Sequence, residues 1–226
     1  MRAWVHTITG KPADVLSLTE VPLPPLPKPE SADVLVKITH ASVCSGGVFL
    51  VAILPTFFRD KPCIPEFEFS GVVMAVDPEG SNSSQDPPLK VGDSVFGIVP
   101  IGRTMKRIPG SAIPSGALAE YVVVPSNHLA RKPENVTFEQ AAGLGGSSVT
   151  MAKTMIMEAN LASGNRVLVY GASSAIGTFA VQMAKEIVGE TGRVIAVCGP
   201  RGQQVMKDLG ADEVCIAEHF QRSYKC

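Results

Sequence analysis

One short stretch, residues 167–182, restricts the fold of this chain more than any other part of its sequence. Its first four residues are apolar and rich in β-branched side chains, which is typical of a buried strand in a parallel sheet. A turn of small residues follows directly. Beyond the turn, apolar residues recur at spacings of three and four, as they do along one face of a helix: Ile176, Phe179, Ala180, Met183, Ala184 and Ile187. The stretch therefore predicts a strand, a tight turn and a helix.

The turn consists of residues small enough for the backbone to lie against a phosphate group, as in a dinucleotide-binding unit. The full G-x-G-x-x-G pattern is not present, because its three key positions read Ala172, Ser174 and Gly177. An ordinary strand-to-helix turn is therefore the alternative interpretation. Because the flanking strand and helix supply the context that the motif needs, we predict that the turn binds a dinucleotide through Gly171, Ala172, Ser173, Ser174, Ala175, Ile176, Gly177 and Thr178.

The second half of the same unit indicates which dinucleotide would bind. Gly189 and Gly192 end the predicted helix, and residues 193–198 form the next apolar strand. An NAD site usually places an acidic residue about twenty positions after the glycine turn. Here residues 197–200 contain no Asp or Glu, and Arg201 follows. Because a guanidinium binds a ribose 2′-phosphate that a carboxylate would repel, the predicted cofactor is NADPH; a solvated loop charge is the alternative role for Arg201.

The composition argues against several other classes of function. The 226 residues carry a formal net charge of −1 and are 45% hydrophobic, which fits a globular protein and gives no electrostatic basis for binding nucleic acid or a membrane. No apolar run approaches the length of a membrane span and the N-terminus lacks a signal-peptide core, so we expect a cytoplasmic protein. The cysteines are scattered without a C-x-x-C pair, which predicts neither a disulfide framework nor a zinc knuckle.

The N-terminal part of the chain has a different pattern. Short apolar segments alternate with Pro- and Gly-rich turns, which predicts an irregular β-barrel or sandwich. Thr137 and Gln140 have the spacing of a capping box and predict a helix that begins at Phe138. We therefore predict a β-rich domain over residues 1–132 and a dinucleotide-binding domain over residues 133–226. Strands are predicted at 15–20, 33–42, 69–76, 94–99 and 116–125, and a second helix at 149–159.

The order of these segments resembles the medium-chain dehydrogenase/reductase superfamily, in its zinc-free quinone oxidoreductase (zeta-crystallin-like) branch. The resemblance is carried by residues 1–4, 65–73, 91–97, 116–121 and 167–185. It implies a mixed α/β fold, with an N-terminal GroES-like β-barrel domain, a partial Rossmann domain with a doubly wound parallel sheet, and the cofactor in the cleft between them. It also implies NADPH-dependent, zinc-independent hydride transfer to a small molecule: a quinone, an enone or another activated alkene.

The zinc-dependent members of the superfamily bind their catalytic metal at positions that can be inspected in this sequence. Cys44 stands where the first cysteine ligand would be, but Phe67 occupies the histidine position and Gly146 falls near the third ligand. A single thiolate cannot hold a catalytic zinc ion, so we predict no metal. Cys44 is then expected to be a small buried side chain rather than a ligand or nucleophile.

The resemblance also implies which side chains act on the substrate. Members of this branch usually carry an Asn-Pro pair and an Asp where this chain has residues 44–45 and Gly47. Thr150 matches a family threonine that lies near the nicotinamide end of the cofactor; a helix-interior threonine that bonds its own backbone is the alternative. Tyr121 and His40 are the candidate proton donors, and both lie on strand patterns that also fit structural roles. Thr150 and Tyr121 are the predicted catalytic residues.

The C-terminal part of the chain is short for this family. A six-stranded Rossmann sheet needs roughly 150 residues, and only about 60 follow Ser163. We therefore expect an incomplete Rossmann domain with exposed apolar faces, which favour aggregation or a partner. Two alternatives to the reductase follow: an inactive remnant that acts only as an interaction module, and a trans-acting enoyl reductase of polyketide synthesis. A homodimer is one expectation for the oligomeric state.

Overall fold

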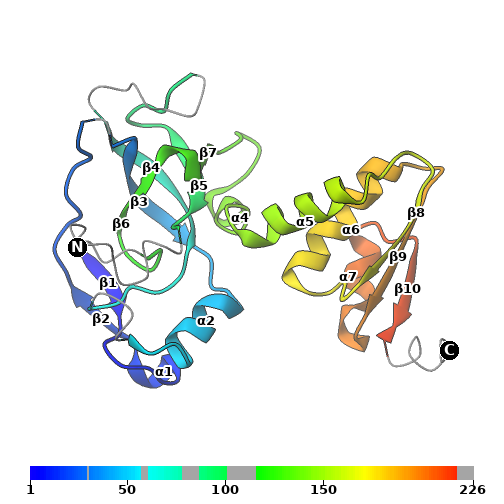
Figure 1. Ribbon diagram of the computed structural model, residues 1–226, viewed down its shortest axis with the longest axis horizontal. Coiled ribbons are helices and arrows are strands. Elements are labelled where there is room, and N and C mark those ends of the chain that lie inside the picture. The colour runs from blue at the N-terminus through cyan, green and yellow to red at the C-terminus, as the bar shows by residue number, and fades with distance from the viewer. Residues whose placement is uncertain (30, 57–60, 78–86, 101–115, 218–226) are drawn as a thin grey trace. The chain divides into compact units, whose positions relative to one another are not determined.

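The computed structural model describes residues 1–29, 31–56, 61–77, 87–100 and 116–217 (Figure 1). The chain forms two compact units, Met1–Gly146 and Ser147–Cys226. The first unit is rich in strands, and the second alternates strands and helices. The mixed α/β fold class predicted from the sequence is therefore confirmed. Across the described residues, none of the helices combines the length and the apolarity that crossing a bilayer requires.

The first unit is organised around a five-stranded antiparallel sheet in which β4 occupies the centre. Its strand order is β6 (Tyr121–Pro125), β3 (Asp33–Ala41), β4 (Glu68–Val76), β5 (Ser94–Ile98) and β7 (Leu129–Arg131). A separate antiparallel pair joins β1 (Arg2–Val5) to β2 (Ser17–Glu20). One cluster of buried side chains, which includes Phe69, Val36 and Val95, fills the interior against this sheet. The helical elements are α1 (Pro12–Val15), α2 (Ser45–Ala52), η2 (Ser126–His128) and α4 (Phe138–Ala142).

Helix α4 shows how a local sequence signal determines the start of an element. The Thr137 hydroxyl accepts a hydrogen bond from the Gln140 amide at 3.3 Å, and the Gln140 side chain accepts one from the Thr137 amide at 3.0 Å. This capping box confirms the predicted start at Phe138. The helix lies in the first unit, where it packs against β3, β4 and β5.

Two predicted strands of the first unit were wrong in part. The segment expected as a strand over 15–20 is preceded by a short helix, and β2 begins only at Ser17. Pro12 favours this helix because proline suits the first helical position. The strand expected over 116–125 begins only at Tyr121. The residues before it are held elsewhere, because the amides of Ala117 and Leu118 donate to the carbonyls of Glu66 and Pro65.

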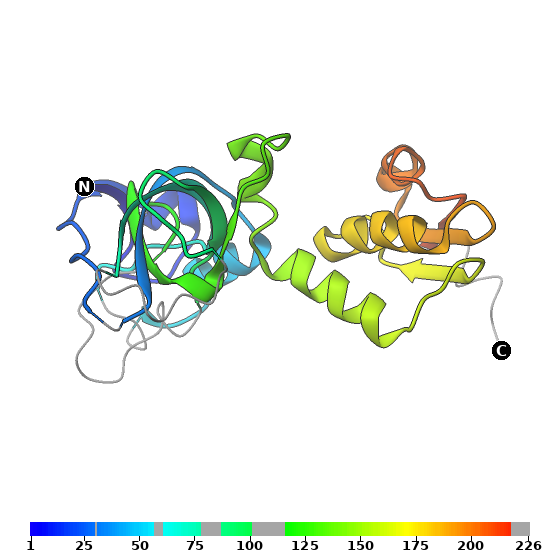
Figure 2. The same cartoon turned by 90° about the horizontal axis from the view of Figure 1, so that it is seen from above.

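The second unit contains the predicted strand–turn–helix–strand sequence. Its described sheet is parallel and has the order β10 (Glu213–Ile216), β9 (Arg193–Cys198) and β8 (Arg166–Tyr170). Helix α6 (Ala175–Val188) packs on β8 and β9, and α5 (Ser147–Glu158) packs on α6 (Figure 2). The remaining elements are η3 (Pro200–Gly202) and α7 (Gln203–Asp208). Its buried cluster includes Val181, Ala184, Val194 and Ala196.

Strand β8 is not the buried strand that the sequence predicts. It lies at one edge of the described sheet, and Leu168 and Tyr170 are 48% and 58% exposed. Strand β9 is more buried because β8 and β10 flank it on both sides and α6 packs on it, whereas β8 has a neighbouring strand on one side only in the described sheet. The buried face of α6 is also shifted from the prediction, because Val181 and Val188 are buried whereas Ile187 is exposed. The exposed apolar side chains on β8 agree with the expectation for an incomplete sheet.

Asp212 connects α6 to the sheet of the second unit, and its replacement should weaken that unit. One carboxylate oxygen accepts a hydrogen bond from Lys185 Nζ at 2.8 Å, and the other accepts one from the Val194 amide at 2.7 Å. The Lys185 bond, followed by the Val194 amide, lowers the pKa of Asp212. We expect D212A to lower the free energy of unfolding by about 1–2 kcal/mol at neutral pH.

The pH dependence of this loss follows from the direction of the pKa shift. An acid whose pKa is lowered by folding adds stability above the ordinary pKa of aspartate, near 3.9, and that stability is lost as the pH falls through the lowered value. The difference in the free energy of unfolding between the wild type and D212A should therefore become smaller in acid. Urea unfolding at neutral pH and at about pH 3 measures it, with E186A, a change at an exposed residue of α6, as the control. A difference that stayed constant with pH would contradict the assignment.

Candidate functional site

The predicted nucleotide turn lies where β8 ends and α6 begins. Gly171 follows the strand with φ of +74°, a conformation that glycine adopts without strain. Ser174 caps the helix, because its hydroxyl accepts a hydrogen bond from the Gly177 amide at 3.1 Å. The Ala172 amide donates to the Val197 carbonyl at 3.0 Å, which fixes the turn to the neighbouring strand. The turn is thus a rigid connection at the carboxyl end of two parallel strands.

Gly177 is the one glycine of the motif that the sequence retains, and the packing explains why. A Cβ atom at this position would collide with the Gly171 carbonyl oxygen and would lie 2.6 Å from the Ala172 carbonyl oxygen. These are backbone atoms of the turn, so they cannot rotate out of the way. The absence of a side chain therefore lets α6 start directly against the end of β8, as the third glycine of a dinucleotide-binding turn does.

The surface of the turn suits a phosphate group. Ser173, Ser174 and Ala175 are exposed, whereas Ala172 and Gly177 are buried beneath them. The first amides of a helix have no partner within the helix and lie at the positive end of its dipole. The start of the 14-residue helix α6, where Ser174 caps the Gly177 amide, therefore has the polarity that an anion requires.

Arg201 lies close to this turn in the fold, although thirty residues separate them in sequence. It is exposed within η3, which follows β9. A Cβ atom on Gly202 would lie 2.7 Å from Ser173 Cβ, so the backbone next to Arg201 packs against the turn itself. Residues 197–206 contain no acidic side chain. The segment beside the turn therefore supplies one positively charged side chain, Arg201, and no carboxylate.

The two predicted catalytic residues belong to different units. Tyr121 is half-buried at the start of β6, where it pairs with Lys37 of β3. Thr150 is exposed on α5, and its carbonyl accepts a hydrogen bond from the Thr154 hydroxyl at 2.9 Å. The structure places both residues on the kinds of element that the sequence predicts, Tyr121 on a strand and Thr150 on a helix. The catalytic role of each residue stays a prediction.

In the first unit, Cys44 has a neighbour that the sequence did not reveal. Cys44 caps α2, with its sulfur accepting from the Gly47 amide at 3.3 Å, and its own amide donates to a Glu66 carboxyl oxygen at 3.1 Å. Burial raises the pKa of Glu66, and the hydrogen bonds from Cys44 offset this only in part. Burial, and then the adjacent Glu66 charge, raises the pKa of the Cys44 thiol. The thiol is half-buried rather than fully buried as predicted.

The positions that would complete a zinc site hold other groups. Phe67 is buried, and the buried Glu68 carboxyl occupies the space into which a Cβ atom on Gly146 would project. Among the residues that the structure describes, no three His, Cys, Asp or Glu side chains gather as metal ligands would. Cys44 and its neighbour Glu66 are therefore not part of a set of three ligands in the described part of the chain, and the absence of a metal stays a prediction.

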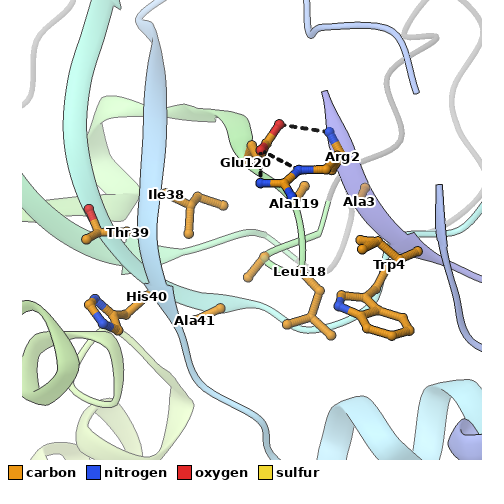
Figure 3. Close-up of a pocket in the computed structure, with 12 residues that line it drawn as sticks. Arg2, Ala3, Trp4, Ile38, Thr39, His40, Ala41, Leu118, Ala119 and Glu120 are labelled. Carbon is orange, nitrogen blue, oxygen red and sulfur yellow. Dashed lines mark hydrogen bonds and ion pairs between the residues drawn. The ribbon is translucent and has the colours of Figure 1, made fainter. Parts of the chain in front are cut away.

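A cavity of about 260 Å³ opens in the first unit between β1, β3 and the segment before β6 (Figure 3). Trp4 and Leu118 lie on one side of it, and His40 lies on the other. An ion pair of 2.9 Å between Arg2 and Glu120 borders the cavity, and the hydrogen bonds from Arg2 lower the pKa of Glu120. The cavity is lined by Arg2, Ala3, Trp4, Leu18, Ile38, Thr39, His40, Ala41, Ala117, Leu118, Ala119 and Glu120.

His40 is the one candidate proton donor that borders this cavity. Its Nε2 atom lies 3.3 Å from a Glu139 carboxyl oxygen, and its Nδ1 atom is buried with no hydrogen-bond partner among the described residues. The cavity could not be predicted from the sequence, because its walls come from four separate segments.

Comparisons with known proteins agree with the geometry of both units. Residues 30–134 match the model of the alcohol dehydrogenase GroES-like domain. The chain is 30% identical to the NADPH-dependent alkenal/one oxidoreductase of Arabidopsis thaliana, covering 94% of this chain and 51% of that protein. It is 28% identical to the trans-enoyl reductase poxH of Penicillium oxalicum, covering 95% of this chain and 60% of that protein.

Solved structures show the same similarity. The quinone oxidoreductase of Coxiella burnetii superposes with a TM-score of 0.73 at 23% identity, over 100% of this chain and 65% of that one. A mycobacterial protein in complex with NADPH superposes with a TM-score of 0.70 at 25% identity, over 96% of this chain and 58% of that one. The chain thus carries an alcohol dehydrogenase GroES-like domain followed by a Rossmann-type unit. The relatives and neighbours that it resembles are described as alkenal/one, enoyl and quinone reductases or oxidoreductases, and the chain spans about half the length of the curated relatives it matches.

Proposed function

We propose that the chain binds NADPH and serves the zinc-independent reduction of a quinone, an enone or another activated alkene. The observation that carries the proposal is the exposed turn at the start of α6, with Gly177 fixing its backbone and Arg201 beside it. The turn would hold the pyrophosphate through its amides, and Arg201 would hold the ribose 2′-phosphate. The NADPH-dependent relative and the neighbour that contains NADPH support this choice of cofactor.

The chemistry of the proposal divides between cofactor and protein. Bound NADPH would supply the hydride, and the protein must orient the acceptor and provide a proton. We assign the orienting role to the Thr150 hydroxyl, which is exposed on α5, and Tyr121 is the proton donor that the sequence predicts. We propose that the acceptor is a small molecule and that the chain binds neither nucleic acid nor a membrane. The cytoplasmic location and the homodimer stay predictions. The Arabidopsis relative is described as chloroplastic.

The cofactor assignment predicts a selective effect of Arg201. A charge-assisted hydrogen bond contributes about 1.5–3 kcal/mol, so R201E should weaken NADPH binding by about 10- to 100-fold and leave NADH binding nearly unchanged. Fluorescence titration of both nucleotides measures this. K207Q, which removes an exposed positive charge from α7, is the matched control. Equal affinity of the wild-type chain for NADPH and NADH would refute the role of Arg201.

Two other functions are separable by assay. The similarity to a trans-enoyl reductase favours reduction of a carrier-bound acyl chain, which predicts activity on acyl-thioesters and none on free quinones. The exposed apolar side chains of β8 favour an inactive interaction module. That alternative predicts no NADPH oxidation with any acceptor, together with oligomers in light scattering.

A further inference from the structure

The cavity of the first unit opens where two of its segments separate. Strand β6 pairs with β3 as far as Lys37, and the Ile38 amide then donates to the Glu120 carbonyl at 2.9 Å. Beyond Ile38, β3 continues along β4, whereas the segment before β6 joins β1 through the hydrogen bond from the Trp4 amide to the Leu118 carbonyl. Backbone hydrogen bonds therefore hold the two walls apart, and the cavity of about 260 Å³ is preformed (Figure 3).

Large apolar side chains line this cavity and stay in contact with water. Trp4 and Leu18 are paired across β1 and β2, and they are 44% and 53% exposed. Ile38 and Leu118 add to the apolar lining. Because covering apolar surface is favourable, and because aromatic rings pack well against an indole, an aromatic ligand suits these walls. The volume lies just below the range of about 300–1,000 Å³ that takes drug-sized ligands, so the ligand has one or two rings.

The charged groups at the cavity already compensate one another. Arg2 Nε donates to one carboxylate oxygen of Glu120 at 2.9 Å, and the Arg2 amide donates to the other at 2.8 Å. The remaining titratable side chain of the lining, His40, lies 3.3 Å from a Glu139 carboxyl oxygen through its Nε2 atom. A charged ligand would compete with the Arg2–Glu120 pair, whereas a neutral ligand leaves it intact. Among the described residues, the Trp4 indole N–H has no acceptor, so it is available to an oxygen of the ligand.

We propose that this cavity binds a small, uncharged aromatic molecule of one or two rings that carries a hydrogen-bond acceptor. The ligand packs against Trp4, Leu18 and Leu118, and it leaves the Arg2–Glu120 ion pair intact. The indole N–H of Trp4 donates to its acceptor atom. Every group of this site belongs to the first unit, so binding depends on neither the nucleotide turn nor the reduction proposed above.

Three naphthalene derivatives that differ mainly in charge test the choice of ligand: 2-naphthol, 2-naphthoate and 2-naphthylmethylammonium. The chain contains one tryptophan, so the Trp4 indole N–H gives a single peak in a proton–nitrogen correlation spectrum and reports directly on the cavity. At neutral pH, 2-naphthol should shift this peak saturably with a Kd below about 1 mM, and each charged analogue should bind at least about tenfold more weakly. A charged analogue that bound more tightly than 2-naphthol, or a peak that none of them shifted, would overturn the proposal.

Variants of the walls test where the ligand binds. Ala41 lines the cavity, so Ala41→Phe should fill it and weaken 2-naphthol binding by at least about tenfold. Ala130→Phe, the same replacement at an exposed alanine of β7, is the matched control. Leu18→Ser removes part of the apolar wall without adding bulk and should weaken binding by about 3- to 10-fold. The spectrum of each variant also shows whether it is folded. Unchanged binding in the folded variants would place the ligand elsewhere and overturn the proposal.

A dilution series without ligand tests a second copy of the chain as the alternative occupant. If another copy covered Trp4 and Leu18, the position of the indole peak would depend on protein concentration, because association follows mass action. With a small-molecule site, the peak should stay in place over about a tenfold dilution and move only when 2-naphthol is added. A peak that moved with dilution and no longer responded to 2-naphthol in the concentrated sample would assign the surface to self-association and overturn the proposal.

Discussion

Gly177→Ala should destabilise the second unit by about 1–3 kcal/mol and weaken NADPH binding by about 100-fold or more. The added Cβ would press on the carbonyls of Gly171 and Ala172 and would lie 2.7 Å from Ala172 Cα. These backbone atoms are held by the hydrogen bond from Ala172 to Val197, so the start of α6 must move away from β8. Such a shift misplaces at least two amides, each worth about 1.5–3 kcal/mol to a bound phosphate.

A matched glycine in the same unit shows that the effect belongs to position 177. Gly199 follows β9, has φ of −72°, and a Cβ atom there would meet nothing within 4 Å. G199A should therefore change the free energy of unfolding by less than about 0.5 kcal/mol and leave nucleotide affinity unaltered. Urea unfolding and fluorescence titration compare the two variants. If G177A bound NADPH within threefold of the wild type, the turn would not be the nucleotide site.

The elements that sequence predicted well are those whose signals are local. The capping box at Thr137 and Gln140 and the strand–turn–helix at residues 167–182 depend on neighbours within a few positions, and both are confirmed. The exposure of β8 was missed because it depends on which strands flank it, and sheet order is a property of contacts between distant segments. The same limit applies to the buried face of α6, which the position of the sheet determines.

The candidate site shows the same division. The nucleotide turn could be found because its residues are consecutive and their small size is visible in the sequence. The Cys44–Glu66 pair could not, because twenty-two positions separate the residues and nothing near Glu66 indicates a left-handed backbone. The one available signal is Gly47, which stands where the branch that the sequence resembles carries an acid. Only the fold shows that another acid fills that space.

Phe69→Ala should produce the largest loss of stability in the first unit, about 3–5 kcal/mol. Phe69 lies on β4, the central strand of the sheet, and is fully buried among the valines of the main cluster. Alanine removes the whole ring and leaves a cavity that the hydrogen-bonded strands on either side cannot collapse to fill. Since domains are stable by only about 5–15 kcal/mol, this change removes a large part of the total.

Met74 provides the comparison on the same strand. It is 43% exposed, so M74A should lower the free energy of unfolding by less than about 1 kcal/mol, although it removes a side chain of similar length. Phe69→Leu should fall between the two, because it keeps an apolar side chain but not its volume. Urea unfolding followed by circular dichroism measures all three. Equal losses in F69A and M74A would mean that β4 does not hold the core of this unit.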